Sequence, residues 1–149
     1  MTESAGLTLI STQVAAATGF PSANVTIAEW GILNRGVSDH YAIIKPGAAN
    51  RPPLSFNVRD NEYRTIIEVW QRYKDDGTPL TTLLGHVDNI IARLDPRRKL
   101  VDTTKTIRDA NVTGMSEVTE QWTKDGGVSW LKREIYLDWT EEESVSYVE

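Results

Sequence analysis

The side chains able to do chemistry are few, and they form no recognisable catalytic pattern. The chain has two histidines, His40 and His86, among 21 acidic residues, and it has no cysteine. The lack of cysteine excludes disulfides, thiolate zinc sites and cysteine nucleophiles. His86 and Asp88 are two positions apart on a predicted helix and do not share a face, and His40 and Asp39 alternate along a predicted strand. A His–Asp pair from separate elements, such as His40 with Asp88, stays open.

Metal, phosphate and nucleotide sites are not predicted either. A metal site needs three or four convergent ligands, and no spacing in the chain provides them. The sequence has no phosphate-binding glycine loop, dinucleotide fingerprint or serine nucleophile elbow. Asp75-Asp76-Gly77 resembles a fragment of a calcium loop but lacks the other ligand positions, so it indicates a turn. We therefore expect no catalytic residue, no metal and no cofactor.

The composition is that of one globular domain. The 149 residues are 40% hydrophobic and 25% charged, which predicts a single domain over residues 1–149 with a real core. The net charge of −5 argues against a general nucleic-acid-binding protein, which needs a basic face. The sequence shows no secretion signal and no apolar run long enough to cross a bilayer. We expect a reducing compartment and no membrane contact.

The stretch that organises the chain runs from residue 62 to residue 94. Residues 62–73 are rich in β-branched and aromatic side chains with a period of two, which predicts a long strand with one buried face. Ile66 and Trp70 interrupt the polar parity, so the second face should be partly covered too. Thr78-Pro79 is typical of a helix start, and residues 78–94 carry an apolar stripe at helical spacing, consisting of Leu80, Leu83, Leu84, Val87, Ile90, Ile91 and Leu94.

The N-terminal half adds a helix, two strands and a long loop. Residues 7–18 predict a helix with a narrow apolar stripe, ended by Gly19, that packs outside the core. Residues 25–33 weakly favour a strand, and residues 39–45 predict a buried one that Pro46-Gly47 ends. The loop at 46–60 is long for a hairpin connection, and loops of that length are usually functional or mobile.

The C-terminal part predicts a hairpin and a tail. The arms are residues 112–122 and 128–139, and the turn between them contains Asp125-Gly126. One parity of the second arm is predicted to be buried, namely Ser129, Leu131, Arg133, Ile135, Leu137 and Trp139. Residues 140–149 are predicted to be a short, mobile acidic tail. The expected fold class is therefore α+β: a mainly antiparallel sheet, an amphipathic helix over about 78–94 on one face, an N-terminal helix and a C-terminal β-hairpin.

Surface features indicate contacts with other protein subunits. Five tryptophans are many for a core of this size, and tryptophan is enriched at interfaces; an aromatic-rich core is the alternative. The 46–60 loop places stiff prolines beside apolar side chains, which suits a partner-contact arm, although Leu54 and Phe56 packing onto the sheet explains them equally well. The candidate interface residues are Arg51, Pro52, Pro53, Leu54, Phe56, Trp122 and Trp130.

The order of elements resembles that of tail terminator (tail completion) proteins of long-tailed bacteriophages and related particles. The resemblance rests on the strand Tyr41-Ala42-Ile43-Ile44-Lys45-Pro46-Gly47, the long loop, the strand at 66–73, the helix at 80–94 and the closing hairpin that ends Tyr136-Leu137-Asp138-Trp139. It covers about residues 7–139, and residues 25–33 fit it least clearly.

The resemblance implies a structural virion protein without catalytic residues. Such a protein assembles in the host cytoplasm and forms a ring, usually a hexamer, in the neck and tail of the virion. The ring caps the tail tube, ends its polymerisation, and joins the tail to a head–tail connector protein, while DNA passes through without specific binding. The negative net charge suits a lumen that repels DNA.

Three other functions stay open. A neighbouring head–tail connector or tail-tube component shares the same kind of fold. A small ligand-binding protein or enzyme would use a pocket lined by Trp, Tyr and a His–Asp pair. A generic adaptor would bind a partner through the loop around Arg51 to Phe56.

Overall fold

Two helices and seven strands make up the part of the chain that the computed structural model describes, which is residues 3–20, 24–27, 39–73, 78–96, 100–101, 106–122 and 129–144. In chain order they are α1 (Glu3–Ala15), β1 (Val25–Ile27), β2 (His40–Asn50), β3 (Val58–Arg72), α2 (Pro79–Leu94), β4 (Leu100–Val101), β5 (Thr106–Met115), β6 (Thr119–Trp122) and β7 (Ser129–Ser144).

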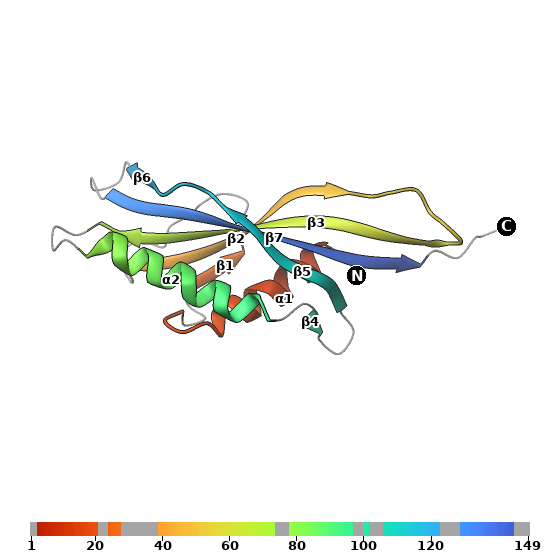
Figure 1. Cartoon of the computed structure of the whole chain (residues 1–149), viewed down its shortest axis with the longest axis horizontal. Coiled ribbons are helices and arrows are strands. Elements are labelled where there is room, and N and C mark those ends of the chain that lie inside the picture. Colours follow the sequence, from red (N-terminus) through yellow and green to blue (C-terminus); the bar gives the residue numbers. More distant parts are fainter. Residues whose placement is uncertain are drawn as a thin grey trace.

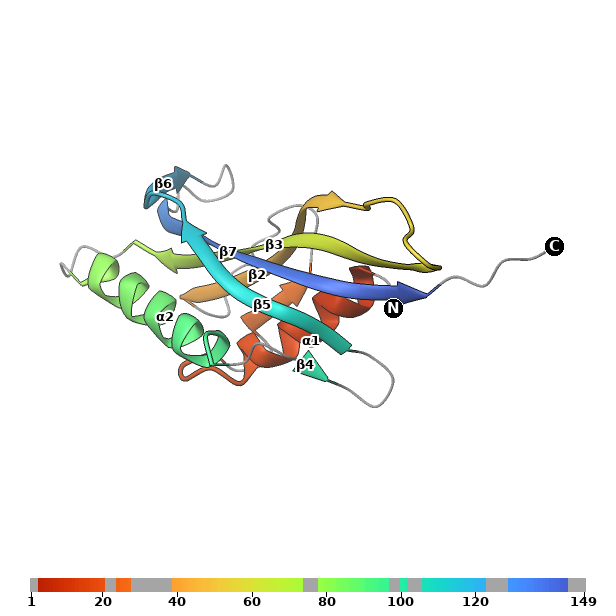
Figure 2. The ribbon, with the colours of Figure 1, turned by 45° about the vertical axis from the view of Figure 1, so that its right-hand side comes forward.

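The strands form one mixed sheet in the order β1-β2-β3-β7-β5-β4, and β6 also pairs with β7 (Figure 1). Only β1 and β2 are parallel among the pairings of the described residues. Figure 2 shows both helices on the same side of this sheet. The predicted α+β class, with its mainly antiparallel sheet, its N-terminal helix and a helix packed on one face, is confirmed.

The centre of the sheet is the pair β3–β7, which stays in regular register from Val58 opposite Ser144 to Arg72 opposite Trp130. The alternation along β3 buries Thr65, Ile67 and Val69 towards the helices, as the period of two predicts. Helix α2 buries its predicted stripe at Leu83, Val87, Ile90 and Leu94, whereas Leu80 is 49% exposed. The long strand and the amphipathic helix are therefore both confirmed.

Helix α1 is part of the core, and the prediction that it packs outside the core is wrong. Leu7, Leu9, Ile10 and Val14 are buried in one cluster with α2 and with the inner face of β2, β3, β5 and β7. The helix comes close to the sheet because Gly6 faces the indole of Trp139 and has no side chain to hold it away. The apolar spacing of α1 predicts less burial than the structure shows. The small residues of α1 let the helix approach the sheet closely, and this approach adds contacts that the spacing of apolar residues does not indicate. Gly19 has a φ of +87°, but the helix already ends at Ala15, so the glycine lies in the turn that follows and does not end the helix as predicted.

Two predicted loops are strand in the structure. Strand β2 continues through Pro46-Gly47 to Asn50, with an irregularity in register between Pro46 and Ala49, and β3 starts at Val58. The predicted 46–60 loop is thus shortened to residues 51–57. Likewise β7 runs to Ser144, so residues 140–144 belong to the sheet, because they pair with the beginning of β3.

The closing hairpin is confirmed, with a longer and interrupted first arm. Strand β5 starts at Thr106 and pairs with the C-terminal half of β7, while β6 pairs with the N-terminal part of β7. Ile135, Leu137 and Trp139 are buried as predicted. The predictions made for residues 28–38, 74–77, 123–128 and 145–149 lie outside the described residues.

The sheet face opposite the helices carries a second, smaller cluster. Tyr41, Ile43, Trp70 and Trp130 are buried there, and the rings of Tyr41 and Trp130 lie 5.8 Å apart. Trp70, Trp130 and Trp139 are therefore core residues in this chain. The partly covered second face predicted from Trp70 is confirmed.

Candidate interaction site

One end of the sheet projects beyond the helices. Figure 1 shows the β2–β3 hairpin and the end of β7 extending past both helices. We call this part the arm, and define it as residues 46–64 together with residues 138–144. Strands β2, β3 and β7 pair side by side in the arm, so the arm is a regular extension of the sheet.

Charged side chains cross-link the strands of the arm. Arg64 donates two hydrogen bonds to Asp138, from Nε to Oδ1 at 2.8 Å and from Nη2 to Oδ2 at 3.1 Å. The hydrogen bonds from Arg64 lower the pKa of Asp138. Arg108 contacts Glu142 at 2.8 Å and Asp60 at 3.4 Å, which ties β5, β7 and β3 together. Glu142, which the sequence assigned to a free tail, is thus paired with Arg108 within the sheet.

The candidate loop residues differ in their exposure. Arg51 and Pro53 are exposed, Pro52 and Leu54 are half-buried, and Phe56 is 98% exposed. Leu54 thus partly packs against the chain, while Phe56 points into solvent. Trp130 is only 6% exposed, so its ring offers little surface to a partner. Trp122 pairs through its backbone with Ser129, and its side chain lies outside the described residues.

A groove of about 380 Å³ crosses the arm. It is lined by residues 48–50 of β2, 62–64 of β3, 138–140 of β7 and Asp109 of β5. Ala48 and Ala49 contribute short apolar side chains. Tyr63 lies against the buried Trp139, with the ring centroids 4.6 Å apart. The groove is therefore open, partly apolar, and bordered by the Arg64–Asp138 ion pair.

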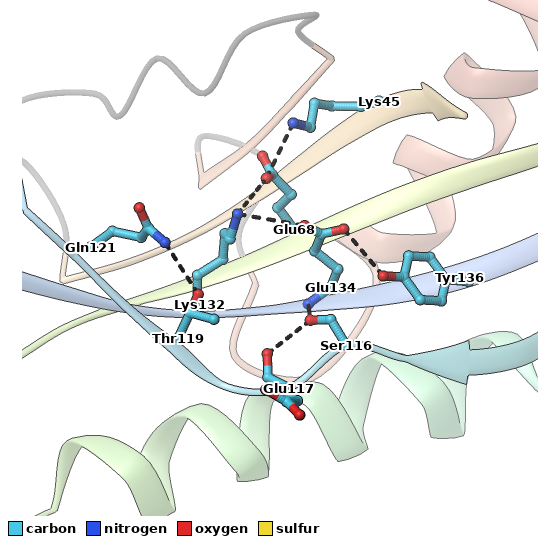
Figure 3. A network of polar contacts seen from close by, with 9 residues as sticks. All are labelled: Lys45, Glu68, Ser116, Glu117, Thr119, Gln121, Lys132, Glu134 and Tyr136. Atoms are coloured by element: carbon cyan, nitrogen blue, oxygen red, sulfur yellow. Dashed lines mark hydrogen bonds and ion pairs between the residues drawn. The ribbon is translucent and has the colours of Figure 1, made fainter. Parts of the chain in front are cut away.

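A charge-balanced network occupies the sheet face away from the helices (Figure 3). The buried carboxylate of Glu68 accepts contacts on Oε2 from Lys45 Nζ at 3.1 Å and Lys132 Nζ at 3.3 Å. Lys132 also contacts Glu134 at 3.4 Å and lies 5.4 Å from the centre of the Trp70 ring. Two cations face two carboxylates, so this network ties strands together and presents no excess charge to a ligand.

The two histidines meet, which the sequence did not reveal. The rings of His40 on β2 and His86 on α2 stack with centroids 4.4 Å apart and an angle of 20°, and Phe20 packs edge-on against both. His40 Nδ1 lies 2.8 Å from Asp39 Oδ1, and Nε2 lies 2.6 Å from the carbonyl oxygen of Gly19. His40 therefore bonds with its neighbour Asp39 and not with Asp88.

The histidine pair fastens the end of α1 to β2 and α2. Both rings are packed against each other and against Phe20, so they form a joint between elements and line no described cavity. No sequence signal indicates this joint, because 46 positions separate the two histidines and only the fold brings them together.

The stability of this joint is expected to depend on pH through His86. Burial, and secondarily the nearby His40, lower the pKa of His86 below its usual 6.5, although Asp39 acts in the opposite direction. The folded state therefore binds the proton more weakly than the unfolded chain. The contribution of His86 is fully present above pH 6.5 and is lost as the pH falls from 6.5 towards the lowered pKa.

Urea unfolding of the wild type and of His86→Gln at pH 7.5, 6.5 and 5.5 measures this effect. Glutamine does not titrate, so the stability of the wild type relative to the variant should fall as the pH is lowered. A relative stability that stays constant or rises on acidification would contradict this role of His86.

The described residues contain no group of three or more acidic residues or histidines placed to hold a metal ion. None of the described helices is long and apolar enough to cross a membrane.

Comparisons with known proteins identify a shared fold and no family. No family model matches the sequence, and no curated protein matches it. A solved chain described as "Virion of native gene transfer agent (GTA) particle" is 11% identical, with a TM-score of 0.54 over 95% of this chain and 100% of that chain. A second solved structure, which carries no functional name, is 16% identical, with a TM-score of 0.50 over 98% of this chain and 94% of that chain. At these identities, the similarity establishes that the fold is common to these chains over nearly their full lengths.

Proposed function

We propose that this chain is a structural protein of a phage-like virion that forms a ring, of six copies, at the junction of tail and neck. The ring caps the tail tube, ends its polymerisation, and joins the tail to the head–tail connector, while DNA passes through its opening. The observation that carries the proposal is the fold shared with a gene transfer agent virion chain over 95% of this chain. The order of elements, which resembles that of tail terminators, supports the same assignment.

The arm is consistent with a protein that acts by contact. It projects past the helices (Figure 2), and ion pairs stiffen it, so it is suited to reach a neighbouring subunit. The histidines are engaged in packing, and the charged network on the opposite face is balanced. These features favour a structural role over a ligand-binding or catalytic one.

The proposal predicts a strong effect on tube growth. Tail tubes polymerised from the purified tube protein of the same particle should become shorter when this chain is added, because a capped end cannot extend. Gold-labelled chain should appear at one tube end by negative-stain microscopy. Label along the whole tube would indicate a tube component, and binding to isolated connector alone would indicate a neck protein. Absence of binding to both would contradict the proposal.

A further inference from the structure

The tip of the arm is a two-residue turn with an unusual residue in it. The backbone N–H of Ser55 donates to the carbonyl of Val58 at 2.8 Å, and the N–H of Val58 donates to the carbonyl of Ser55 at 3.0 Å. Between them Phe56 has a φ of 51° and Asn57 a φ of 65°. Two successive positive φ values are typical of the tight turn that joins paired strands, and the preferred residues are asparagine, aspartate and glycine.

Phe56 is poorly suited to this position. A bulky side chain disfavours the left-handed conformation, and the ring is 98% exposed, so it gains no packing within this chain. Asparagine or glycine would make the same turn with less strain. Strained residues that the fold gains nothing from often mark functional contacts, and exposed aromatic side chains are frequent interface anchors.

The groove on the same arm can receive such a ring. Its volume of about 380 Å³ is within the range of sites that hold small aromatic groups. The short side chain of Ala48 leaves room beside Arg64, whereas Tyr63, the preceding residue of β3, points to the opposite face against Trp139. The guanidinium of Arg64 is held by Asp138 and lies 5.4 Å from the centre of the Tyr136 ring, a position in which it can also contact an incoming aromatic ring.

The ring and the groove of one copy cannot meet. Phe56 is 98% exposed, so its ring does not lie in the groove of its own chain. From Val58 beside the tip to Glu62 at the groove, β3 advances four positions, which is about 13 Å at about 3.3 Å per residue. A ring and a groove on different parts of one surface join copies head to tail, which gives a closed ring or a filament.

We propose that Phe56 of one copy docks in the groove beside Ala48, Arg64 and Asp138 of a neighbouring copy, and that this contact links the copies of the ring. The inference rests on the proposed function in that the chain must self-associate. Beyond the proposed function, the inference names the residue that anchors the contact and the surface that receives this residue.

Two variants separate the two halves of this contact. Phe56→Asn keeps the turn and removes the ring, and it should weaken self-association about thirtyfold or more, as the loss of an interface anchor does. Ala48→Trp should fill the groove and weaken self-association by a similar factor. Asn57→Gly is the matched control, because it changes the same turn, retains Phe56 and should associate as the wild type does.

Mixing the variants gives the decisive result. Each carries one intact half, so a one-to-one mixture of Phe56→Asn and Ala48→Trp should form mixed dimers and nothing larger in analytical ultracentrifugation. Circular dichroism checks folding, and Ala48→Leu replaces Ala48→Trp if the latter does not fold. For a wild type that assembles only on tube ends, the same variants are compared by the number of fluorescent copies at each end.

The outcomes distinguish this inference from the proposed function. Assembly of Phe56→Asn with wild-type affinity would overturn the docking contact and leave the ring intact. A wild type that is monomeric both in solution and beside tail tubes would overturn both. Binding of the wild type, but not of Phe56→Asn, to phosphatidylglycerol vesicles without self-association would assign Phe56 to a membrane and overturn the contact.

Discussion

Replacing Trp139 with alanine is expected to lower the free energy of unfolding by about 3–5 kcal/mol. The indole is 1% exposed, lies against Tyr63 on β3, and faces Gly6 of α1. Its Nε1 donates a hydrogen bond of 2.8 Å to Thr65 Oγ1. Truncation therefore opens a cavity where α1, β3 and β7 meet, and also removes a buried donor. Urea unfolding followed by far-ultraviolet circular dichroism measures the loss.

Trp139→Phe separates the two contributions. It keeps one six-membered aromatic ring and removes Nε1 with two ring carbons, so it should cost about 1–3 kcal/mol for the lost buried hydrogen bond and a smaller packing loss than Trp139→Ala. A loss below about 1 kcal/mol for Trp139→Ala would contradict the central position of this side chain. Equal losses for the two variants would mean that packing contributes little.

Gly6→Val is expected to lower the free energy of unfolding by about 3 kcal/mol, because it overpacks the contact between α1 and the sheet. A Cβ at position 6 would lie 2.7 Å from Cζ2 of the buried Trp139 ring, and nearer still to Cη2. The indole cannot move aside while its hydrogen bond to Thr65 holds. The same unfolding experiment measures the change.

Gly85→Val is the matched control. Gly85 also lies within a helix, but nothing is within 4 Å of the position that its Cβ would take. Valine and glycine differ by only about 0.5 kcal/mol in helix propensity, so this variant should be nearly as stable as the wild type. Similar losses at both positions would show that a general helix effect, and not contact with Trp139, dominates.

The sequence predicted the elements whose signal is local. The alternation along residues 62–73 and the helical stripe at 78–94 each lie within one segment, and both appear as β3 and α2. Proline after a buried strand was taken as its end, yet β2 continues through Pro46. Proline is compatible with an edge strand, and the register pairs Pro46 with Thr65 beyond the segment that β1 covers. Gly47 allows this because a Cβ there would lie 2.9 Å from the carbonyl oxygen of Arg64.

The acidic end of β7 shows why distant pairing is not visible in composition. Glu141, Glu142 and Glu143 suggest a solvated tail when considered alone. Their partners are Asn61, Asp60 and Arg59 across the strand pair, and Arg108 on β5 contacts Glu142. These partners are more than 30 positions away along the chain, so no local pattern contains them.

The sequence predicts a partner-contact loop that includes Phe56, because prolines and apolar side chains occur there together. The structure places Phe56 at an exposed turn, and its contact with a partner stays a prediction. The sequence did not reveal that Phe56 occupies a left-handed turn position, because Phe-Asn is not a sequence typical of that turn. The sequence did not predict the stacking of His40 on His86. The two residues are distant in the chain, and only the packing of α2 on the sheet brings them together.

We propose that this chain acts as a multi-copy ring at a tail-tube end. Light scattering over a concentration series, with the chain alone and with purified tail tubes of its particle, measures the mass of the assembly. The chain has a mass of 16.7 kDa, and a ring of six copies should have about six times that mass, either free or formed at tube ends. A mass of one chain at every concentration, with no copies retained at tube ends, would contradict this proposal.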